Sequence, residues 1–362
     1  MTGAIAIVIE SLGGGGAQHV ATTLANAWAA QGRQINVITF RDRDSDAFAL
    51  DPRVCRVVIG GAADSPNPAA AMAANLRRIL RLRSTLRQSD AQTVLSFVCS
   101  TNVLTVLASW GLRRRVVVSE RNDPARQPLP IMWKLMRHLF YRHADLVIAN
   151  SRAAIDAMSR YVPAAHMTWL PNPLRTAPGS DGVRYDGPFF LAVGRLTGQK
   201  AYDVLIAAFA EIGKLLPGWR LVILGDGPLR DDLTRLSAAL GVSERVQFAG
   251  HVGDPFAWYR AAKVFVHAAR YEGLPNAVLE AMSEALPVVV TDGQPGLRDF
   301  VRDGESGIVV GVDSVPALAD AMKRLAKDEG LRRRLGDAAR DAVAPCRTDR
   351  AVAAWSAALA LP

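Results

Sequence analysis

The residues best suited to chemistry lie in the segment Tyr271–Met282. Pro275 is typical of the first turn of a helix, which would leave the backbone amides of Asn276, Ala277 and Val278 pointing out of the helix N-terminus. Amides in that position and the helix dipole both stabilise anions. The segment therefore predicts a binding site for a diphosphate.

Two carboxylates flank this helix start. Glu272 follows a strand predicted at Val264–His267, and Glu280 lies about one turn into the helix. Glu280 is placed to accept hydrogen bonds from ribose hydroxyls while Glu272 faces a sugar. The alternative is that Glu272 is an ordinary loop carboxylate and Glu280 lies on the helix surface.

Two cations follow another predicted strand, Phe189–Val193. Gly194 is followed directly by Arg195, and Lys200 comes five residues later. A guanidinium binds phosphate oxygens through two parallel hydrogen bonds, and an ammonium adds a point charge. Both cations suit a diphosphate, although a solvated basic loop would have the same composition.

Two glycine turns also follow predicted strands. Gly15 and Gly16 end a glycine run that opens a helix, where a bare backbone lets a ligand come close. Their spacing is not a dinucleotide fingerprint, and no acidic residue ends the next strand, so a nicotinamide site is discounted. The turn Gly225, Asp226, Gly227 is either an ordinary turn that connects two elements or part of the ligand-binding edge of the sheet. For the first glycine run, the alternative is a loose connecting loop without a ligand.

The elements that must position these residues are short β-branched runs that alternate with helical patterns. Continuous apolar strands between helices predict parallel sheets covered on both faces. The predicted strands are Ala4–Ile9, Ile35–Phe40, Val54–Ile59, Thr93–Phe97, Val116–Ser119, Leu146–Ala149, Met167–Leu170, Phe189–Val193, Leu221–Leu224, Val246–Ala249, Val264–His267, Val288–Thr291 and Ile308–Val310.

The alternation pauses near residues 171–187, which indicates a linker between two doubly wound domains. We predict an N-terminal domain at 1–172 and a C-terminal domain at 173–345, facing each other across a cleft. A last helix within 346–362 is expected to pack back on the first domain. Ligands of such sheets bind at the carboxyl ends of the strands.

The combination of Arg195 with Lys200, the Gly225 turn, and Glu272 eight residues before Glu280 resembles glycosyltransferase family 4. The resemblance covers nearly the whole chain and implies the two-Rossmann-domain GT-B architecture. It implies a retaining transferase that uses a UDP- or GDP-sugar without a bound metal or other cofactor.

The family pattern also implies roles for individual residues. Arg195 and Lys200 would bind the diphosphate and Glu280 the ribose. Glu272 and the amides near Leu274 and Asn276 would hold the sugar. The neighbouring residues assigned to the same donor site are Gly194, Gly225, Asp226, Gly227, Gly273, Pro275, Ala277 and Val278.

One loop departs from the family. Many members carry a histidine where this chain reads Ser119–Pro124, and there is none here. The segment is similar to a bacterial subgroup that builds exopolysaccharides and lipid-linked oligosaccharides, some of whose members use UDP-N-acetylgalactosamine or UDP-galactose. Glu120 is then the candidate to orient an acceptor hydroxyl or take its proton, and Arg121 to hold an acceptor phosphate. The alternative is a structural Glu120–Arg121 ion pair.

The composition narrows the class of protein further. The 362 residues include 43 Lys and Arg against 34 Asp and Glu, a formal charge of +9 that suits anionic partners. No nucleic-acid-binding module is recognisable. Three separated cysteines, no secretory leader and no span-length apolar run predict a cytoplasmic location, with peripheral membrane association.

Two basic, apolar stretches could carry that association: Asn75–Gln88 and Ile131–His143. Each could instead be a helix packed on its sheet. The acidic loop Asp42–Asp46 mimics a metal-binding motif of another transferase fold, but a solvated loop is expected, and the scattered histidines lack metal spacing. His251 and His267 are taken as packed or rim residues.

The predicted activity is therefore transfer of a hexose or N-acetylhexosamine, from a UDP-sugar, to a growing polysaccharide or a polyprenyl-diphosphate-linked glycan. Two alternatives stay open. A nucleotide-sugar epimerase of the same fold would need no acceptor, and a nucleotide-sugar-binding subunit would have lost catalysis.

Overall fold

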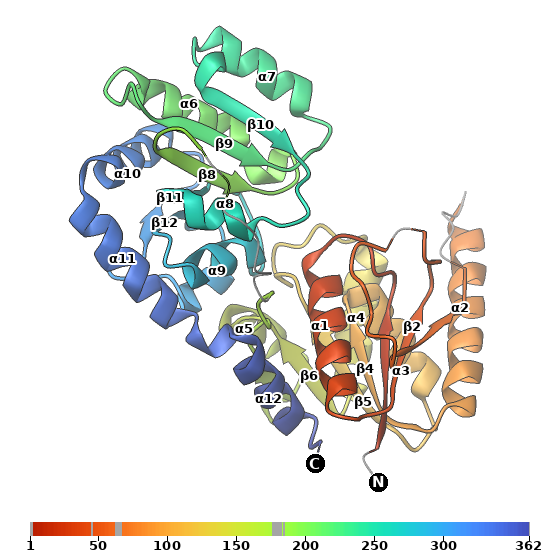
Figure 1. The fold of residues 1–362 in the computed structure, drawn as a ribbon. Helices are drawn as coiled ribbons and strands as arrows, with labels where there is room; N and C mark the ends of the chain where they lie inside the picture. Colours follow the sequence, from red (N-terminus) through yellow and green to blue (C-terminus); the bar gives the residue numbers. More distant parts are fainter. Residues whose placement is uncertain (1–2, 45, 62–66, 176–182, 184, 362) are drawn as a thin grey trace. The chain divides into compact units, whose positions relative to one another are not determined.

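The structure is a computed structural model that describes residues 3–44, 46–61, 67–175, 183 and 185–361 (Figure 1). The chain divides into two compact units, Met1–Arg175 with Thr348–Pro362, and Thr176–Arg347. Much of the predicted linker, 176–182 and 184, lies outside the described residues, as does Ser45 of the acidic loop.

The first unit is a parallel sheet with helices on both faces. Its strands are β1 (Ala4–Ile9), β2 (Ile35–Thr39), β3 (Cys55–Val58), β4 (Ala91–Phe97), β5 (Arg115–Glu120), β6 (Leu146–Ala149) and β7 (Met167–Trp169). Its helices are α1 (Gly16–Ala30), α2 (Pro68–Gln88), α3 (Cys99–Ser109), α4 (Ile131–Phe140), α5 (Arg152–Met158), α12 (Thr348–Ala358) and the short 3-10 helices η1 (Tyr141–His143) and η2 (Ala164–His166).

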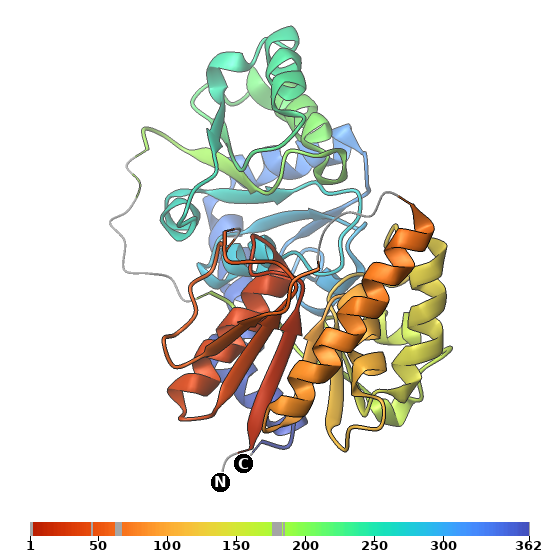
Figure 2. The same ribbon diagram turned by 90° about the vertical axis from the view of Figure 1, so that its right-hand side faces the viewer.

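The strand order in this sheet is β3-β2-β1-β4-β5-β6-β7, with every neighbouring pair parallel. Alternate residues of β1 pack on opposite faces, as a strand requires. Ile5 and Ile7 meet α1 and α12, whereas Ala6 and Val8 meet α2 and α3. Figure 2 shows α2, drawn in orange, lying along this unit.

The second unit has the same plan. Its strands are β8 (Phe189–Val193), β9 (Arg220–Leu224), β10 (Val246–Gly250), β11 (Val264–His267), β12 (Val288–Thr291) and β13 (Ile308–Val310). Its helices are α6 (Tyr202–Gly213), α7 (Arg230–Ala239), α8 (Phe256–Ala261), α9 (Asn276–Ser283), α10 (Val315–Lys327), α11 (Glu329–Ala342) and the 3-10 helices η3 (Gly198–Lys200), η4 (Ser243–Arg245), η5 (Pro295–Asp299) and η6 (Ala344–Cys346).

The second sheet runs in the order β10-β9-β8-β11-β12-β13. Residues of α6, α7 and α10 form one core with one face of the sheet, while the aromatic residues of α8 contact Phe189 and Phe265 on the other face. Two doubly wound parallel sheets are what the strand and helix patterns predicted, so this part of the prediction is confirmed.

The last helix, α12, belongs to the first unit although it is the last element of the chain. Trp355 Nε1 donates to the carbonyl oxygen of Pro171 at 3.0 Å, and Trp28 Nε1 of α1 donates to Ser356 Oγ at 2.9 Å. Burying two indoles whose N–H groups are both satisfied fixes α12 against α1 and the end of β7. Among the described residues, no helix is long and apolar enough to cross a membrane.

Candidate functional site

The second sheet has its topological switch point between β8 and β11, where the connections on the two sides run in opposite directions. The loops that leave the carboxyl ends of these two strands diverge, and the crevice between them is where open α/β sheets bind ligands. Arg195 and Lys200 follow β8, and Glu272 follows β11. The fold therefore brings the predicted cations and the predicted sugar-facing carboxylate to one place.

The loop after β8 is held in shape by close backbone contacts. Gly194 has φ 155°, and a Cβ there would lie 3.0 Å from both Lys200 Cε and Tyr202 Oη. The Tyr202 hydroxyl donates to the carbonyl oxygen of Gly194 at 3.1 Å. The Lys200 stem therefore packs directly over Gly194, which explains why a glycine is needed at this position.

The glycine turn after β9 supports the same loop. A Cβ at Gly225 would overlap the carbonyl of Gly194, and one at Gly227 would come within 2.6 Å of the carbonyl oxygen of Leu196. Asp226 is exposed and accepts a hydrogen bond from the Gly227 amide at 2.8 Å. Gly225 and Gly227 thus have a clear structural purpose, and contact of this turn with a ligand stays a prediction.

Glu272 connects the two loops. One carboxylate oxygen pairs with Lys200, and the other lies 3.1 Å from Nε2 of His267 at the end of β11. Burial by itself raises the pKa of Glu272, but attraction to Lys200 and the hydrogen bond to His267 outweigh it and lower the pKa to about 2. Glu272 is therefore an ionised, paired carboxylate rather than an ordinary loop residue.

Arg270 ties the loops together a second time. Its backbone amide donates to the carbonyl oxygen of Gln199 at 2.8 Å, and its guanidinium pairs with Asp203 at 2.7 Å and Asp313 at 2.8 Å. Gln199 Nε2 in turn donates to the Tyr271 carbonyl oxygen at 2.8 Å. Sequence reasoning missed both Arg270 and His267, because nothing in the spacing of single residues indicates contacts between two loops.

Arg195 differs from these paired cations. Its side chain is exposed, and it forms no ion pair with any carboxylate in the described part of the chain. Arg195 leaves the same strand end as Lys200, and its guanidinium, which has no counter-ion among the described residues, adds positive charge to the loop after β8.

The helix start after Glu272 is partly as predicted. α9 begins at Asn276 after Pro275 and has no side-chain cap. The Gly273 carbonyl oxygen accepts from the Gly296 amide at 3.2 Å, and Leu274 is buried. The Val278 amide donates to the Pro275 carbonyl oxygen at 3.2 Å, so the prediction that this amide is free is wrong. The first turn is tightened and uses that amide internally.

Two further residues complete this region. Glu280 is buried in α9, where Tyr259 of α8 donates to its Oε2 at 3.0 Å, which rules out the surface position considered above. Ala277 lies in the first turn of α9, and its amide donates to no backbone acceptor among the described residues. Contact of Glu280 with a ribose stays a prediction.

The first sheet has its own switch point, between β1 and β4, and the glycine run follows β1 there. A Cβ at Gly14 would meet nothing within 4 Å, and one at Gly15 would meet only the flexible end of Gln18. Gly15 has φ 170°, which any residue adopts, and Gly16 begins α1. Because the fold does not demand glycine at Gly14 or Gly15, the bare backbone is consistent with the close approach of a ligand.

Glu120 requires a correction. It is fully buried, and its Oε1 accepts from the amides of Arg121 and Asn122 at 3.1 and 3.3 Å. Its Oε2 accepts from the Tyr141 hydroxyl at 2.9 Å and lies 3.6 Å from Arg137. Both oxygens are engaged inside the unit, so we reassign Glu120 from acceptor contact to a structural role.

The alternative Glu120–Arg121 ion pair is not found either. Arg121 is buried, donates to Ser119 Oγ at 3.2 Å, and lies 5.6 Å from the centre of the Trp355 ring. Burial lowers the pKa of Arg121 to about 9. The cation that pairs with Glu120 comes from α4, at Arg137, which the local sequence could not indicate.

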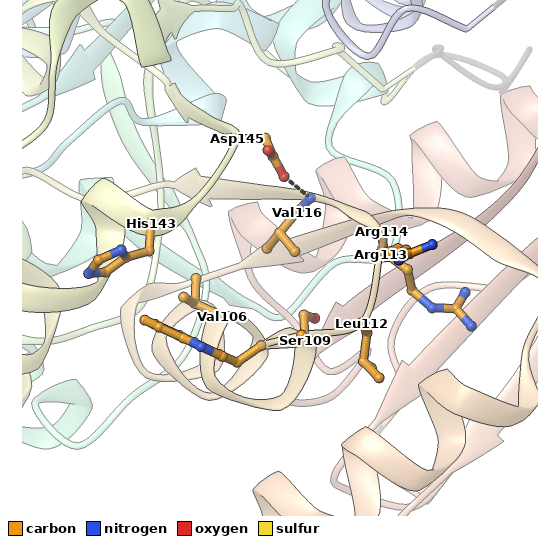
Figure 3. Close-up of a pocket in the computed structure, with 10 residues that line it drawn as sticks. Val106, Ser109, Leu112, Arg113, Arg114, Val116, His143 and Asp145 are labelled. Carbon is orange, nitrogen blue, oxygen red and sulfur yellow. Dashed lines mark hydrogen bonds between the residues drawn. The ribbon is translucent and has the colours of Figure 1, made fainter.

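The first unit also contains a hollow of about 510 Å³ that is separate from these residues (Figure 3). It is lined by Arg113 and Arg114 before β5 and by His143 and Asp145 before β6. Asp145 accepts from the Val116 amide at 2.7 Å. The hollow therefore lies at the amino ends of the strands, opposite the edge where such sheets bind ligands.

Two family models match this chain in succession. Residues 15–173 match the model described as Glycosyl transferase 4-like domain. Residues 177–342 match the model described as Glycosyl transferases group 1. The second match contains the switch point with Lys200 and Glu272.

Two Campylobacter jejuni proteins are similar over almost the whole chain. One, named GalNAc-alpha-(1->4)-GalNAc-alpha-(1->3)-diNAcBac-PP-undecaprenol alpha-1,4-N-acetyl-D-galactosaminyltransferase, is 28% identical over 337 residues, 91% of each chain. The other, named N-acetylgalactosamine-N,N'-diacetylbacillosaminyl-diphospho-undecaprenol 4-alpha-N-acetylgalactosaminyltransferase, is 26% identical over 342 residues, 91% of this chain and 92% of that protein.

Among solved structures, Anabaena HepE in complex with UDP matches with a TM-score of 0.84. The match covers 98% of this chain and 99% of that chain at 18% sequence identity. A likeness at this level of identity establishes the fold.

Proposed function

Because this chain belongs to the group 1 glycosyltransferases with a glycosyl transferase 4-like first domain, we propose that it moves a hexose or N-acetylhexosamine, with retention, from a nucleotide diphosphate sugar to a growing polysaccharide or lipid-linked glycan. The family resemblance and the GT-B architecture predicted from the sequence are confirmed. The observation that carries the proposal is the Lys200–Glu272 pair at the second switch point. The loop that carries Lys200 also carries Arg195, which pairs with no carboxylate among the described residues.

A UDP-sugar is the donor we favour. The HepE structure holds UDP, and the two Campylobacter jejuni relatives are named as N-acetylgalactosaminyltransferases. Their names also include undecaprenol linked through a diphosphate, which supports a polyprenyl-diphosphate-linked glycan as the acceptor class.

The proposed mechanism stabilises the leaving nucleoside diphosphate. Negative charge grows on its phosphate oxygens as the bond to the sugar breaks, and Arg195, Lys200 and the first turn of α9 neutralise that charge. Preorganised charges of this kind usually contribute the largest single part of a rate enhancement. In this mechanism Glu280 binds the ribose of the donor, and Glu272 binds its sugar.

Retention in this proposal does not use Glu272 as a nucleophile. Both of its oxygens are already engaged, with Lys200 and His267, and its pKa of about 2 makes it weakly basic. We therefore favour attack of the acceptor on the same face that the diphosphate leaves, with the leaving phosphate taking the acceptor proton.

A product assay tests this function. The protein is incubated with a panel of radiolabelled UDP- and GDP-sugars and a bacterial membrane extract, and the anomeric configuration of the product is determined by NMR. Label in lipid or polysaccharide with the donor's configuration is expected. Conversion of the donor into another nucleotide sugar without an acceptor would indicate the epimerase, and tight donor binding without any turnover would indicate the binding subunit.

The outer side of α2, α3 and α4 supports peripheral binding to a bilayer. Most of the large hydrophobic side chains exposed in the described part of the chain lie on this layer. They are Met72, Leu76, Leu80, Trp110, Ile131, Met132, Leu135 and Leu139. On α2 they recur every four residues, which places them on one face, while Leu82 and Leu86 face the sheet. We call this set the α2–α4 surface.

The charged residues of these three helices are all basic. The sequences of α2, α3 and α4 contain no aspartate or glutamate, whereas Arg77, Arg81 and Arg87 on α2 and Lys134 on α4 are exposed. Apolar side chains flanked by long cations suit a membrane that carries anionic lipids, where each cation contributes about 1 kcal/mol near the surface. We propose that this surface rests on such a membrane.

Sedimentation with vesicles tests the α2–α4 surface. We expect binding to phosphatidylglycerol vesicles at low salt and release at 1 M salt, where the Debye length is about 3 Å. Replacing Leu76, Leu80, Ile131 and Leu135 by serine should reduce the bound fraction severalfold. The control replaces Leu215 and Leu240 of the second unit, which are also exposed, and should bind like the parent. A parent protein that stays in the supernatant at low salt would contradict the proposal.

A further inference from the structure

His267 is a buried histidine in direct contact with the proposed donor site. It ends β11 with 4% of its surface exposed, and its ring stacks on Phe265 of the same strand, with centroids 6.3 Å apart. Its Nε2 lies 3.1 Å from Glu272 Oε2. From the sequence alone, we interpreted His267 as a packed or rim residue.

The direction of this hydrogen bond follows from the partner. Glu272 is ionised and can only accept, so Nε2 of His267 must carry the hydrogen. Burial and the nearby Lys200 ammonium lower the pKa of His267, which keeps the ring neutral. His267 therefore acts as an uncharged donor to one oxygen of Glu272, while Lys200 occupies the other.

These contacts form a chain that ends at a catalytic charge. His267 fixes the Glu272 carboxylate, the carboxylate holds the Lys200 ammonium, and the Lys200 stem packs over Gly194. Lysine is a point charge on a flexible stem, so its position depends on what holds it. A carboxylate fixed at one oxygen only could rotate and carry the ammonium with it.

We propose that His267 is a positioning residue, which holds Glu272 in the orientation that places Lys200 for the diphosphate of the donor. The inference rests on the proposed function of Lys200 and Glu272. His267 touches neither donor nor acceptor. It keeps the charges in place before the reaction begins, which is the condition under which they contribute most to the rate.

Two substitutions at His267 separate the hydrogen bond from the packing. His267→Leu keeps the bulk and loses the donor, and kcat should fall by about tenfold to a hundredfold, the range for losing a hydrogen bond to a charged group. KM for the donor should change by less than about threefold, because the groups that bind it remain. His267→Gln keeps an N–H at similar reach and should recover most of kcat. Phe265→Leu is the matched control, since it perturbs the same strand and the stacked ring without touching the hydrogen bond, and should keep the parent kcat.

A double-mutant cycle tests whether His267 acts through Glu272. In a Glu272→Gln background, His267→Leu should lower kcat by less than about twofold more, because the carboxylate it orients is gone. Effects of the two substitutions that multiply, or a His267→Leu variant with the parent kcat, would overturn the positioning role. A Glu272→Gln variant that itself turns over like the parent would overturn the proposed donor site instead, so the two failures are distinguishable.

Discussion

The switch points of the two sheets share a strand order but are built from different chemistry. In the second sheet, Lys200, Glu272 and His267 form a connected polar chain, and Arg270 clamps the two loops together. In the first sheet the corresponding loop is a run of glycines with no required conformation at Gly14 or Gly15. Topology thus decides where a ligand can bind, and side chains decide which ligand is bound.

The two carboxylates at the ends of β5 and β11 show the same contrast. Glu272 retains some exposure and bridges two loops, whereas Glu120 is fully enclosed by Tyr141, Arg137 and two backbone amides. A carboxylate at the carboxyl edge of a sheet is therefore no guide to function by itself. Its partners determine whether it serves ligand binding or the integrity of the loop.

The largest effect should come from the cations of the second switch point. Arg195→Ala and Lys200→Ala should each lower kcat by about 10²–10³, because in the proposed mechanism each removes a charge that stabilises the leaving diphosphate. The unfolding midpoint should stay near that of the parent for Arg195→Ala, whose side chain is exposed. Turnover is measured with the donor at saturation.

Arg235→Ala provides the matched control. Arg235 is an exposed cation on α7 that, among the described residues, forms an ion pair only with its neighbour Asp232, and its removal should leave turnover unchanged. Near-normal turnover of Arg195→Ala or Lys200→Ala at saturating donor would overturn the assignment of the diphosphate site.

Glu120 should show the opposite behaviour, a large effect on stability and a small one on chemistry. Glu120→Gln leaves Arg137 as a buried charge without its counter-ion, and losing one partner of a buried pair costs about 3–5 kcal/mol. Urea unfolding followed by a signal from the first unit measures the loss. At a temperature where the variant is fully folded, its turnover should be within about twofold of the parent.

A stable Glu120→Gln variant that binds donor normally and transfers slowly would restore the acceptor role predicted from the sequence. Hydrolysis of the donor without acceptor should then persist, since the second switch point is untouched. The ratio of transfer to hydrolysis therefore separates the two roles.

Much of the fold could be predicted because each strand is a local pattern. β1, β6, β8, β11, β12 and β13 begin and end at the predicted residues. Where the two differ, β2, β3 and β7 are shorter than predicted, and the other strands gain residues whose pairing depends on neighbours. An example is Ala91 of β4, which pairs with Ala4. The places of Arg195, Lys200 and Glu272 were predictable for the same reason, since each follows a recognisable strand, while their roles stay predictions.

The contacts between loops were not predictable in this way. Nothing marks His267 and Arg270 as important until β8 and β11 are known to be neighbouring strands. Arg137, which pairs with Glu120, is 17 residues away from it in the sequence. The free amide predicted at Val278 was lost to a tightened first turn. In each case the prediction was wrong or incomplete because the partner of the residue is brought close only by the folded chain. Buried polar groups must pair with whichever partner lies there.

The smallest effect should follow removal of divalent metal. In the proposed mechanism Arg195, Lys200 and the start of α9 supply the charge that a metal would supply, so excess EDTA should change activity by less than about twofold. In the acidic loop of the first unit, Arg56 pairs with Asp46 and donates to the carbonyl oxygen of Asp42 at 3.0 Å, which places a cation where a metal would need open carboxylates. The described residues contain no cluster of three His, Cys, Asp or Glu side chains that could hold a metal ion. If EDTA abolished the activity and manganese restored it, the essential positive charge would come from a bound ion instead of the side chains of the second unit. The contrast between the two switch points would then need a different explanation.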